Sequence, residues 1–160
     1  IDPRVKHQSR LSFILAFLDA QQKDPQAWPL LMDLDGNISE PWGSNFLFVS
    51  KGSIFTSTNK TVLEGVTKGT VVELAEELGI SVIEGNFTPY DVYNADEAFT
   101  TATSYEIQPV CSLDGIKIGE QIPGPITSNL IKMLGKKVGL DIIDQAMSHL
   151  SKEERLNIDG

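Results

Sequence analysis

The pattern of hydrophobic and polar positions predicts helices that alternate with short strands. Residues 10–23 carry apolar side chains at the i, i+3, i+4, i+7 spacing of a helix with one buried stripe, formed by Leu11, Ile14, Leu15, Phe17 and Leu18. Ser9 is its expected N-cap. Pro25 and Pro29 end this segment, because proline supplies no backbone N–H and disfavours helix in the residue before it.

Short apolar runs bounded by turn residues predict strands, over residues 28–33, 45–50, 53–57, 80–84, 97–101 and 106–111. Tight turns are expected at Asp35-Gly36-Asn37, Lys51-Gly52 and Leu113-Asp114-Gly115. Further helices are predicted over 70–78, with Gly79 at the C-cap, and over 88–93, 126–137 and 141–150. Strands joined by hairpins and interleaved with helices favour an α/β fold with a mixed sheet, in one domain over residues 1–150 followed by a charged tail at 151–160.

Composition and charge narrow the function classes. The 160 residues are 41% hydrophobic and 22% charged, which is enough apolar material for a core. The formal net charge of −9 argues against nucleic acid as a partner, since phosphate backbones require a positive surface. No apolar run reaches the roughly 20 residues of a membrane span, and no signal segment is seen at the start of the chain.

Cysteine and histidine are scarce. A single cysteine, Cys111, excludes an internal disulfide and a cysteine-built zinc site, and it suits a reducing compartment, so we expect a cytoplasmic location. With only His7 and His149, a histidine-rich metal centre is also excluded.

Two features carry candidate chemistry near helix starts. Lys6 lies between an extended segment and the first helix; a lysine there is either a surface charge or a nucleophile aimed into a pocket. Gly65-Val66-Thr67 precedes the second helix, and its amide groups either bind a phosphate or begin an ordinary helix.

Two other features are equally open when judged from the residues alone. Glu40 precedes Trp42 and other apolar residues, and it is either an exposed acid or a buried ionic partner. The hydroxyl-rich stretch 100–104 is either an anion site or the solvent-facing side of a strand edge.

Five ordered blocks of sequence give a more specific indication. They read DPRVKHQSRL, LLMDLDGNISEPWGSNFLFV, LEGVTKGTVVELAEELGISV, ADEAFTTATSYEIQPV and LDGIKIGEQIPGPIT. In this order they resemble the large C-terminal domain of the fold-type IV pyridoxal-phosphate enzymes, the class IV aminotransferases, from Asp2 to about Gly139. That family includes branched-chain and D-amino acid aminotransferases, (R)-amine transaminases and aminodeoxychorismate lyase. The resemblance implies a mixed sheet or pseudo-barrel flanked by helices.

The resemblance also implies a role for each candidate residue toward pyridoxal 5′-phosphate. Lys6 is similar to the lysine that forms the Schiff base with the cofactor and serves as general acid and base. Glu40 is similar to the carboxylate that pairs with the pyridine nitrogen, which keeps the ring an electron acceptor. The remaining expected contacts are Asn45 beside the glutamate, Gly65, Val66, Thr67 and Thr103 at the phosphate, and Ser104 and Trp42 at the substrate. No metal is expected.

By the same resemblance, the partners are an amino acid or amine donor and a 2-oxo acid acceptor, in a homodimer. Because the family is longer at its N-terminus, we expect this chain to be a fragment without the small lobe, and to be inactive alone. A lyase of the same family uses the same lysine and glutamate and is the alternative, as is a truncated domain that holds no cofactor.

The chain departs from the family pattern at several positions. Leu11 stands where several members have a tyrosine that contacts the phenolic oxygen of the cofactor. Pro41-Trp42 replaces small residues and narrows the expected pocket. Glu64 and Lys68 replace a proline and an arginine beside the phosphate turn, which places a negative charge near the expected dianion.

Overall fold

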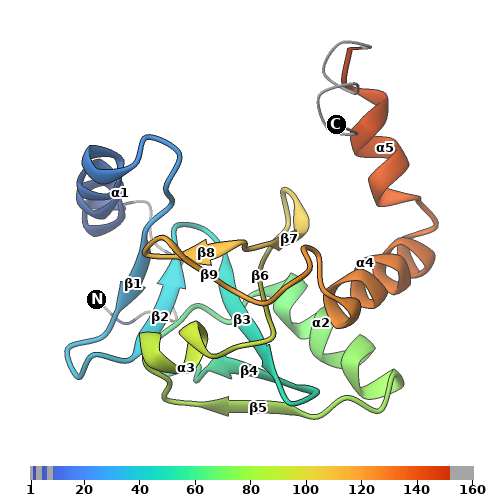
Figure 1. The fold of residues 1–160 in the computed structure, drawn as a ribbon, viewed down its shortest axis with the longest axis horizontal. Coiled ribbons are helices and arrows are strands. Elements are labelled where there is room, and N and C mark those ends of the chain that lie inside the picture. The colour runs from blue at the N-terminus through green and yellow to red at the C-terminus, as the bar shows by residue number, and fades with distance from the viewer. Residues whose placement is uncertain (1, 3–4, 7–8, 152–160) are drawn as a thin grey trace.

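The computed structural model describes residues 2, 5, 6 and 9–151 of the chain. Its helices are α1 (Leu11–Lys23), α2 (Val66–Glu77), α3 (Pro89–Tyr93), α4 (Pro125–Val138) and α5 (Ile142–Ser148). Its strands are β1 (Leu30–Met32), β2 (Ile38–Pro41), β3 (Asn45–Ser50), β4 (Ser53–Ser57), β5 (Val82–Gly85), β6 (Glu97–Ala102), β7 (Glu106–Pro109), β8 (Ser112–Leu113) and β9 (Ile116–Lys117). Figure 1 shows these elements in one ribbon view, and the predicted mixed α/β fold is confirmed.

A five-stranded mixed sheet in the order β5-β4-β3-β6-β7 forms the body of the molecule. Its neighbouring strands are antiparallel except for β4 and β5, which are parallel. A parallel pair needs a crossover connection, and α2 supplies it between these two strands. The predicted turn between β3 and β4 is confirmed: Lys51 and Gly52 have φ angles of 51° and 76°, as a two-residue hairpin turn requires.

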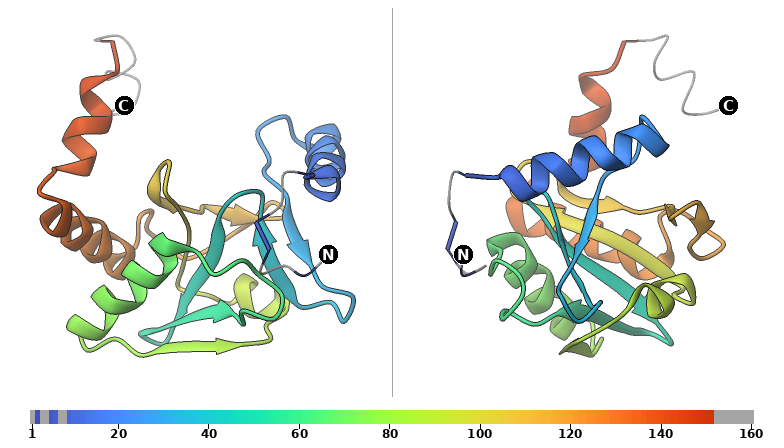
Figure 2. Two further views of the ribbon diagram at one scale, coloured as in Figure 1. Left: turned by 180° about the vertical axis from the view of Figure 1, so that it is seen from behind. Right: turned by 90° about the vertical axis from the view of Figure 1, so that its left-hand side faces the viewer.

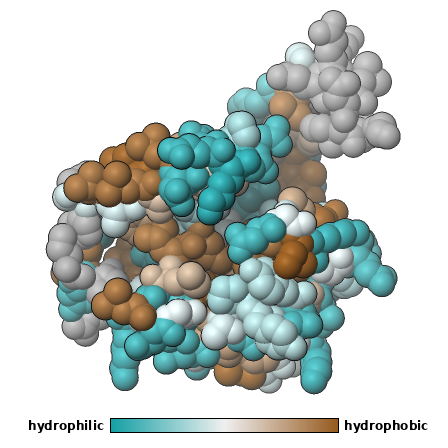
Figure 3. Space-filling model, turned by 60° about the vertical axis from the view of Figure 1, so that its left-hand side comes forward, coloured by the Kyte–Doolittle hydropathy of each residue, from teal (hydrophilic) through white to brown (hydrophobic). Residues whose placement is uncertain are grey.

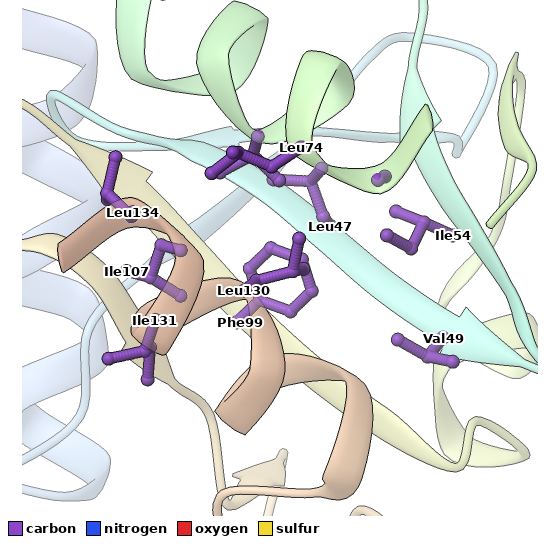
Figure 4. Packing of buried hydrophobic residues seen from close by; sticks show 11 residues of the cluster. Leu47, Val49, Ile54, Leu74, Phe99, Ile107, Leu130, Ile131 and Leu134 are labelled. Atoms are coloured by element: carbon purple, nitrogen blue, oxygen red, sulfur yellow. The ribbon is translucent and has the colours of Figure 1, made fainter. Parts of the chain in front are cut away.

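Helices α2 and α4 cover one face of the sheet, as the views in Figures 1 and 2 agree. Side chains from both helices meet β3, β4, β6 and β7 in one apolar cluster, shown in Figure 4. Phe99 and Leu47, which pair across β6 and β3, lie at its centre and are fully buried. This cluster holds α2 and α4 against the sheet.

A second apolar cluster lies on the opposite face of the same strands. Phe46 and Phe48 of β3 alternate with the residues of the first cluster, as the pleat of a strand requires. Phe48 stacks on Phe55, and Phe87 meets both rings edge to face. Ile38 of β2 belongs to this cluster, so β2 lies on the face away from α2.

The predicted buried stripe on the first helix is wrong. None of the residues of α1 is buried, and Leu11 and Leu18 are 62% and 53% exposed. Apolar atoms accordingly reach the surface on the side of the molecule that carries α1 (Figure 3). What holds α1 is Phe17, whose ring meets Trp28 and Trp42 edge to face, with centroid distances of 5.8 and 5.9 Å.

Several predicted boundaries also move. The N-cap of α1 is Arg10 rather than Ser9, and no side chain caps it. Helix α2 begins at Val66, directly after Gly65 and before the predicted start at Thr70. Strand β7 ends at Pro109, before Cys111. The predicted tail lies almost wholly outside the described residues.

Within residues 9–151, no helix is long and apolar enough to cross a bilayer. The described part of the chain also contains no group of three or more histidine, cysteine, aspartate or glutamate side chains placed to hold a metal ion.

Candidate functional site

A cavity of about 360 Å³ lies between the start of α1, strand β2 and the loop that precedes α2. Its volume falls within the range typical of small-molecule sites. Lys6 and Glu40, far apart in the sequence, both line it. The other lining residues are Val5, Ser9, Arg10, Leu11, Ser12, Phe13, Ser39, Gly43, Thr61 and Leu63.

The carboxylate of Glu40 is held on one side of the cavity by two donors. Its Oε2 accepts hydrogen bonds from the backbone N–H of Leu63, at 2.9 Å, and from Nδ2 of Asn45, at 3.2 Å. The hydroxyl of Ser39 donates to the carbonyl of Thr61 at 2.6 Å, which ties β2 to the same loop. These contacts fix the direction of the carboxylate.

Burial raises the pKa of Glu40 to about 7, because desolvation penalises the charged form. The hydrogen bond from Leu63 and the positive charges of Arg10 and Lys68 oppose this effect and lower the pKa. A carboxyl that is partly buried in a cavity and titrates near neutrality is suited to pair with a cationic group of a ligand.

Asn45, the first residue of β3, links Glu40 to the start of α2. Its Nδ2 also donates to the carbonyl of Leu63 at 2.8 Å. Its Oδ1 lies against Gly65, the N-cap of α2, so closely that a Cβ added to Gly65 would overlap this oxygen. Glycine is therefore required at position 65 for the helix start to approach the sheet.

The first turn of α2 is not capped by any side chain. Its amide groups, which include those of Val66 and Thr67, point beyond the helix and form the kind of donor set that binds phosphate. Glu64, which the sequence places beside this turn, has an exposed side chain.

Lys68, in the first turn of α2, is buried and donates to three acceptors outside the helix. The residue is 4% exposed, and its Nζ donates to Oε1 of Glu84 at 2.8 Å, to Oδ1 of Asn59 at 3.1 Å and to the carbonyl of Ser57 at 3.4 Å. Its charge is thus committed to β4, β5 and the loop between β4 and α2.

Thr103 and Ser104 lie in the turn between β6 and β7, and both are exposed. Neither lines the cavity. Trp42 is partly buried against Phe17 and likewise is not among the lining residues. The proposed contacts of these three residues with phosphate and substrate stay predictions.

Arg10 is a cavity residue that sequence reasoning missed. It is the N-cap residue of α1, and its guanidinium approaches Gly43. The positive charge of Arg10 lowers the pKa of Glu40. Its position four residues after Lys6, at the entry to a helix, was the available signal. The N–H of Leu63 could not be found this way, because a backbone donor leaves no mark in the residue type.

The cavity and its surroundings fit pyridoxal phosphate. Lys6 and Glu40 line one cavity of suitable size, and so does Leu63, two residues before the uncapped start of α2. Gly65, Val66 and Thr67 are not among the lining residues, and their contacts with phosphate stay predictions. The overlap that a Cβ on Gly65 would make shows how closely the backbone there is drawn to Asn45. Leu11, which replaces the tyrosine of several family members, lines the cavity and offers no polar group.

Comparison with known proteins gives the family. The model of the family described as amino-transferase class IV matches residues 1–113. The chain belongs to the class IV aminotransferases. A curated relative, the branched-chain-amino-acid aminotransferase of Pseudomonas aeruginosa, is 38% identical over 103 residues, which cover 64% of this chain and 34% of the relative. The chain therefore spans about a third of that relative's length.

Solved structures of class IV aminotransferases share the fold. The branched-chain amino acid aminotransferase of Escherichia coli is 36% identical with a TM-score of 0.73, and the match covers 78% of this chain and 43% of the other. Another branched-chain amino acid aminotransferase, solved with pyridoxamine 5′-phosphate, is 32% identical with a TM-score of 0.73, over 78% of this chain and 42% of the other.

The fold is also shared outside the branched-chain enzymes. A Legionella pneumophila structure, itself proposed to be a 4-amino-4-deoxychorismate lyase, has a TM-score of 0.77 at 23% identity, over 83% of this chain and 49% of the other. This likeness concerns the fold alone.

Proposed function

We propose that this chain is the cofactor-binding part of a pyridoxal-phosphate-dependent aminotransferase that transfers the amino group of an amino acid or amine to a 2-oxo acid. The observation that carries the proposal is that Lys6 and Glu40 line one cavity. When bound, pyridoxal phosphate supplies an aldehyde that bonds to amines and a ring that accepts the electrons released when a substrate Cα–H bond breaks.

Lys6 has the nucleophilic role in this proposal. Its Nζ would hold the cofactor through a carbon–nitrogen bond, and as a free neutral amine it would accept the proton from the substrate Cα and return it. The side chain of Lys6 is exposed where it lines the cavity.

Glu40 would keep the pyridine nitrogen protonated. Its Oε2 accepts from the N–H of Leu63 and the amide of Asn45, and the carboxylate would accept one further hydrogen bond from the ring nitrogen. A cationic ring nitrogen would offset the desolvation that raises the pKa of Glu40.

The start of α2 is the proposed phosphate site. The amide groups of Val66 and Thr67 and the hydroxyl of Thr67 serve as donors, and the helix dipole favours the dianion. Thr103 is proposed as the second threonine at the phosphate, and Ser104 and Trp42 as residues facing the substrate. The relatives that name a substrate class act on branched-chain amino acids, which we propose as the first donors to test.

The test is covalent trapping in the full-length protein. With pyridoxal phosphate it should give a visible absorption band, and borohydride should fix the cofactor to the peptide that contains Lys6. Lys6→Ala should lose both signals, whereas Lys23→Ala, on the exposed end of α1, should keep them. A band and a labelled peptide that persist in Lys6→Ala would show that another residue carries the cofactor.

A lyase of the same family is the second candidate, because it uses the same lysine and glutamate and its fold is shared with the Legionella pneumophila structure. Product analysis separates the two reactions. Release of pyruvate without an amino acceptor indicates the lyase, and acceptor-dependent exchange of amino groups indicates the transaminase. Equal cofactor affinity of this 160-residue chain and of the full-length protein would show that the chain is sufficient for binding.

A further inference from the structure

A polar row interrupts the apolar face of the sheet beneath the first turn of α2. Thr101 of β6 pairs directly with Asn45 of β3. Both side chains point to the face that carries α2, because they are two residues along from Phe99 and Leu47, which belong to the cluster beneath that helix. Glu97 confirms the direction, since it lies on the same face of β6 and contacts the start of α4.

The hydroxyl of Thr101 is buried in this row without a protein partner. Thr101 is 2% exposed, and its Oγ1 makes no hydrogen bond to any described residue. The Oγ1 of Thr58 is in the same condition. An unpaired buried hydroxyl costs free energy comparable to a lost hydrogen bond, so the hydroxyl of Thr101, opposite Asn45, requires an explanation.

Thr101 is the direct partner of Asn45 across β6 and β3. The ladder between β3 and β4 ends at the pair of Leu47 and Thr56, so Thr58 lies beyond the end of β4. Directly opposed residues in antiparallel strands have Cβ atoms about 4.5–5.5 Å apart. At this spacing the hydroxyl of Thr101 makes no direct hydrogen bond to Asn45 in the structure, and one water molecule bridges such a gap.

We propose that the hydroxyl of Thr101 and the Oδ1 of Asn45 hold one ordered water molecule beneath the first turn of α2. Two polar groups meet the lower end of the two to four that an internal water requires. By bonding to Oδ1, the water fixes the amide of Asn45 with its Nδ2 aimed at Glu40. Thr101 is then a positioning residue for Glu40, and it acts through Asn45.

The proposed water site does not depend on the proposed function. Only the effect of this site on cofactor binding rests on the proposed function. Three cations of the described residues bear on this test: Lys6 and Arg10 line the cavity that Glu40 also lines, and the charges of Arg10 and Lys68 lower the pKa of Glu40. Variants at Thr101 leave all three in place. Any change in the titration of Glu40 therefore reports on the amide of Asn45.

The experiment follows the carboxyl of Glu40 by carbon-13 NMR in the cofactor-free full-length protein. Thr101→Val keeps the shape but removes the hydroxyl, and it should raise the pKa of Glu40 by about 0.3–0.5, because a less firmly held Nδ2 stabilises the carboxylate less. Thr101→Ser should restore the original titration. Thr56→Val is the matched control: it removes a buried hydroxyl that donates to the carbonyl of Phe46 at 3.0 Å and should leave Glu40 unchanged.

The opposite result is equally clear. A Thr101→Val protein that is more stable than the wild type and has an unchanged Glu40 pKa would overturn the proposal. The hydroxyl would then be an unpaired buried group that destabilises the fold and has no effect on Asn45. If this variant does not fold, a high-resolution crystal structure of the wild type decides. Density for a water within about 3.2 Å of both Thr101 Oγ1 and Asn45 Oδ1 supports the site, and its absence rejects it.

Discussion

The amide oxygen of Asn45 lies against Gly65, where any side chain would have to be placed. The amide cannot easily retreat, because its Nδ2 is engaged by Glu40 and by the carbonyl of Leu63. This contact joins the carboxyl side of the cavity to the proposed phosphate turn.

Gly65→Ala should therefore damage both parts of the site. We expect a loss of about 2 kcal/mol in the free energy of unfolding, from the displacement of Asn45, and weaker binding of pyridoxal phosphate. Gly69→Ala is the matched control in the same helix, since a Cβ there meets no atom within 4 Å. It should stabilise the protein by about 0.5–1 kcal/mol. Chemical denaturation of the two variants measures the difference, and similar behaviour would contradict the contact.

Glu40 should make the stability of the cofactor-free protein depend on pH. Its pKa is raised from 4.5 to about 7 in the folded state, so the folded protein binds the proton more tightly than the unfolded chain does. The contribution of Glu40 is therefore most favourable below about pH 4.5 and is lost as the pH rises through 7. The loss should be on the order of 1 kcal/mol, less than a full conversion, because the side chain is only partly buried.

Denaturation curves at several pH values check this expectation. Glu40→Gln carries no titrating proton at this position, so the difference between wild type and variant isolates Glu40 from the other carboxyl groups. A difference that stays constant between pH 4 and 8 would show that the pKa of Glu40 is not raised.

Local patterns were sufficient to predict most of the fold. The strand at 45–50 and its hairpin partner were identified by apolar runs and by Lys51-Gly52, because turn chemistry and alternation act over a few residues. The helix at α1 was predicted correctly, but the prediction that its apolar stripe is buried was wrong. Periodicity predicts which residues share a face, and only tertiary structure decides what that face meets.

The site was predictable only in part. Resemblance to the family singled out Lys6 and Glu40, which line one cavity, and their roles stay predictions. Arg10 was missed because a lone arginine before a helix is common. The N–H of Leu63 and the hydroxyl of Thr101 owe their importance to positions across the sheet, and sequence spacing does not record these.

The positive charge of Arg10 should lower the pKa of Glu40, since both residues line the same cavity. Its charge lowers the pKa of Glu40, so Arg10→Met should raise that pKa further, by about 0.5. Lys23→Met removes a positive charge at the other end of α1 and should leave Glu40 unchanged. Carbon-13 titration of the carboxyl in both variants provides the measurement, and equal curves would place the guanidinium of Arg10 away from Glu40.

Glu97 should matter more for stability than any exposed acid of the chain. Its Oε1 accepts from the N–H of Ile126 at 2.9 Å, and its Oε2 accepts from the N–H and the hydroxyl of Thr127 at 2.8 and 2.7 Å. The N-cap residue of α4 is Gly124, which has no side chain to cap the helix, so a carboxylate from β6 serves its first turn instead.

Glu97→Ala should consequently cost about 3 kcal/mol in the free energy of unfolding, since it leaves three donors at the start of α4 unpaired. Glu73→Ala is the control: it breaks an exposed ion pair with Lys137, 2.7 Å long, and should cost no more than about 0.5 kcal/mol. Urea denaturation of both variants tests the ranking. Equal losses would mean that the start of α4 is held by its apolar contacts with α2 and the sheet, and not by the carboxylate.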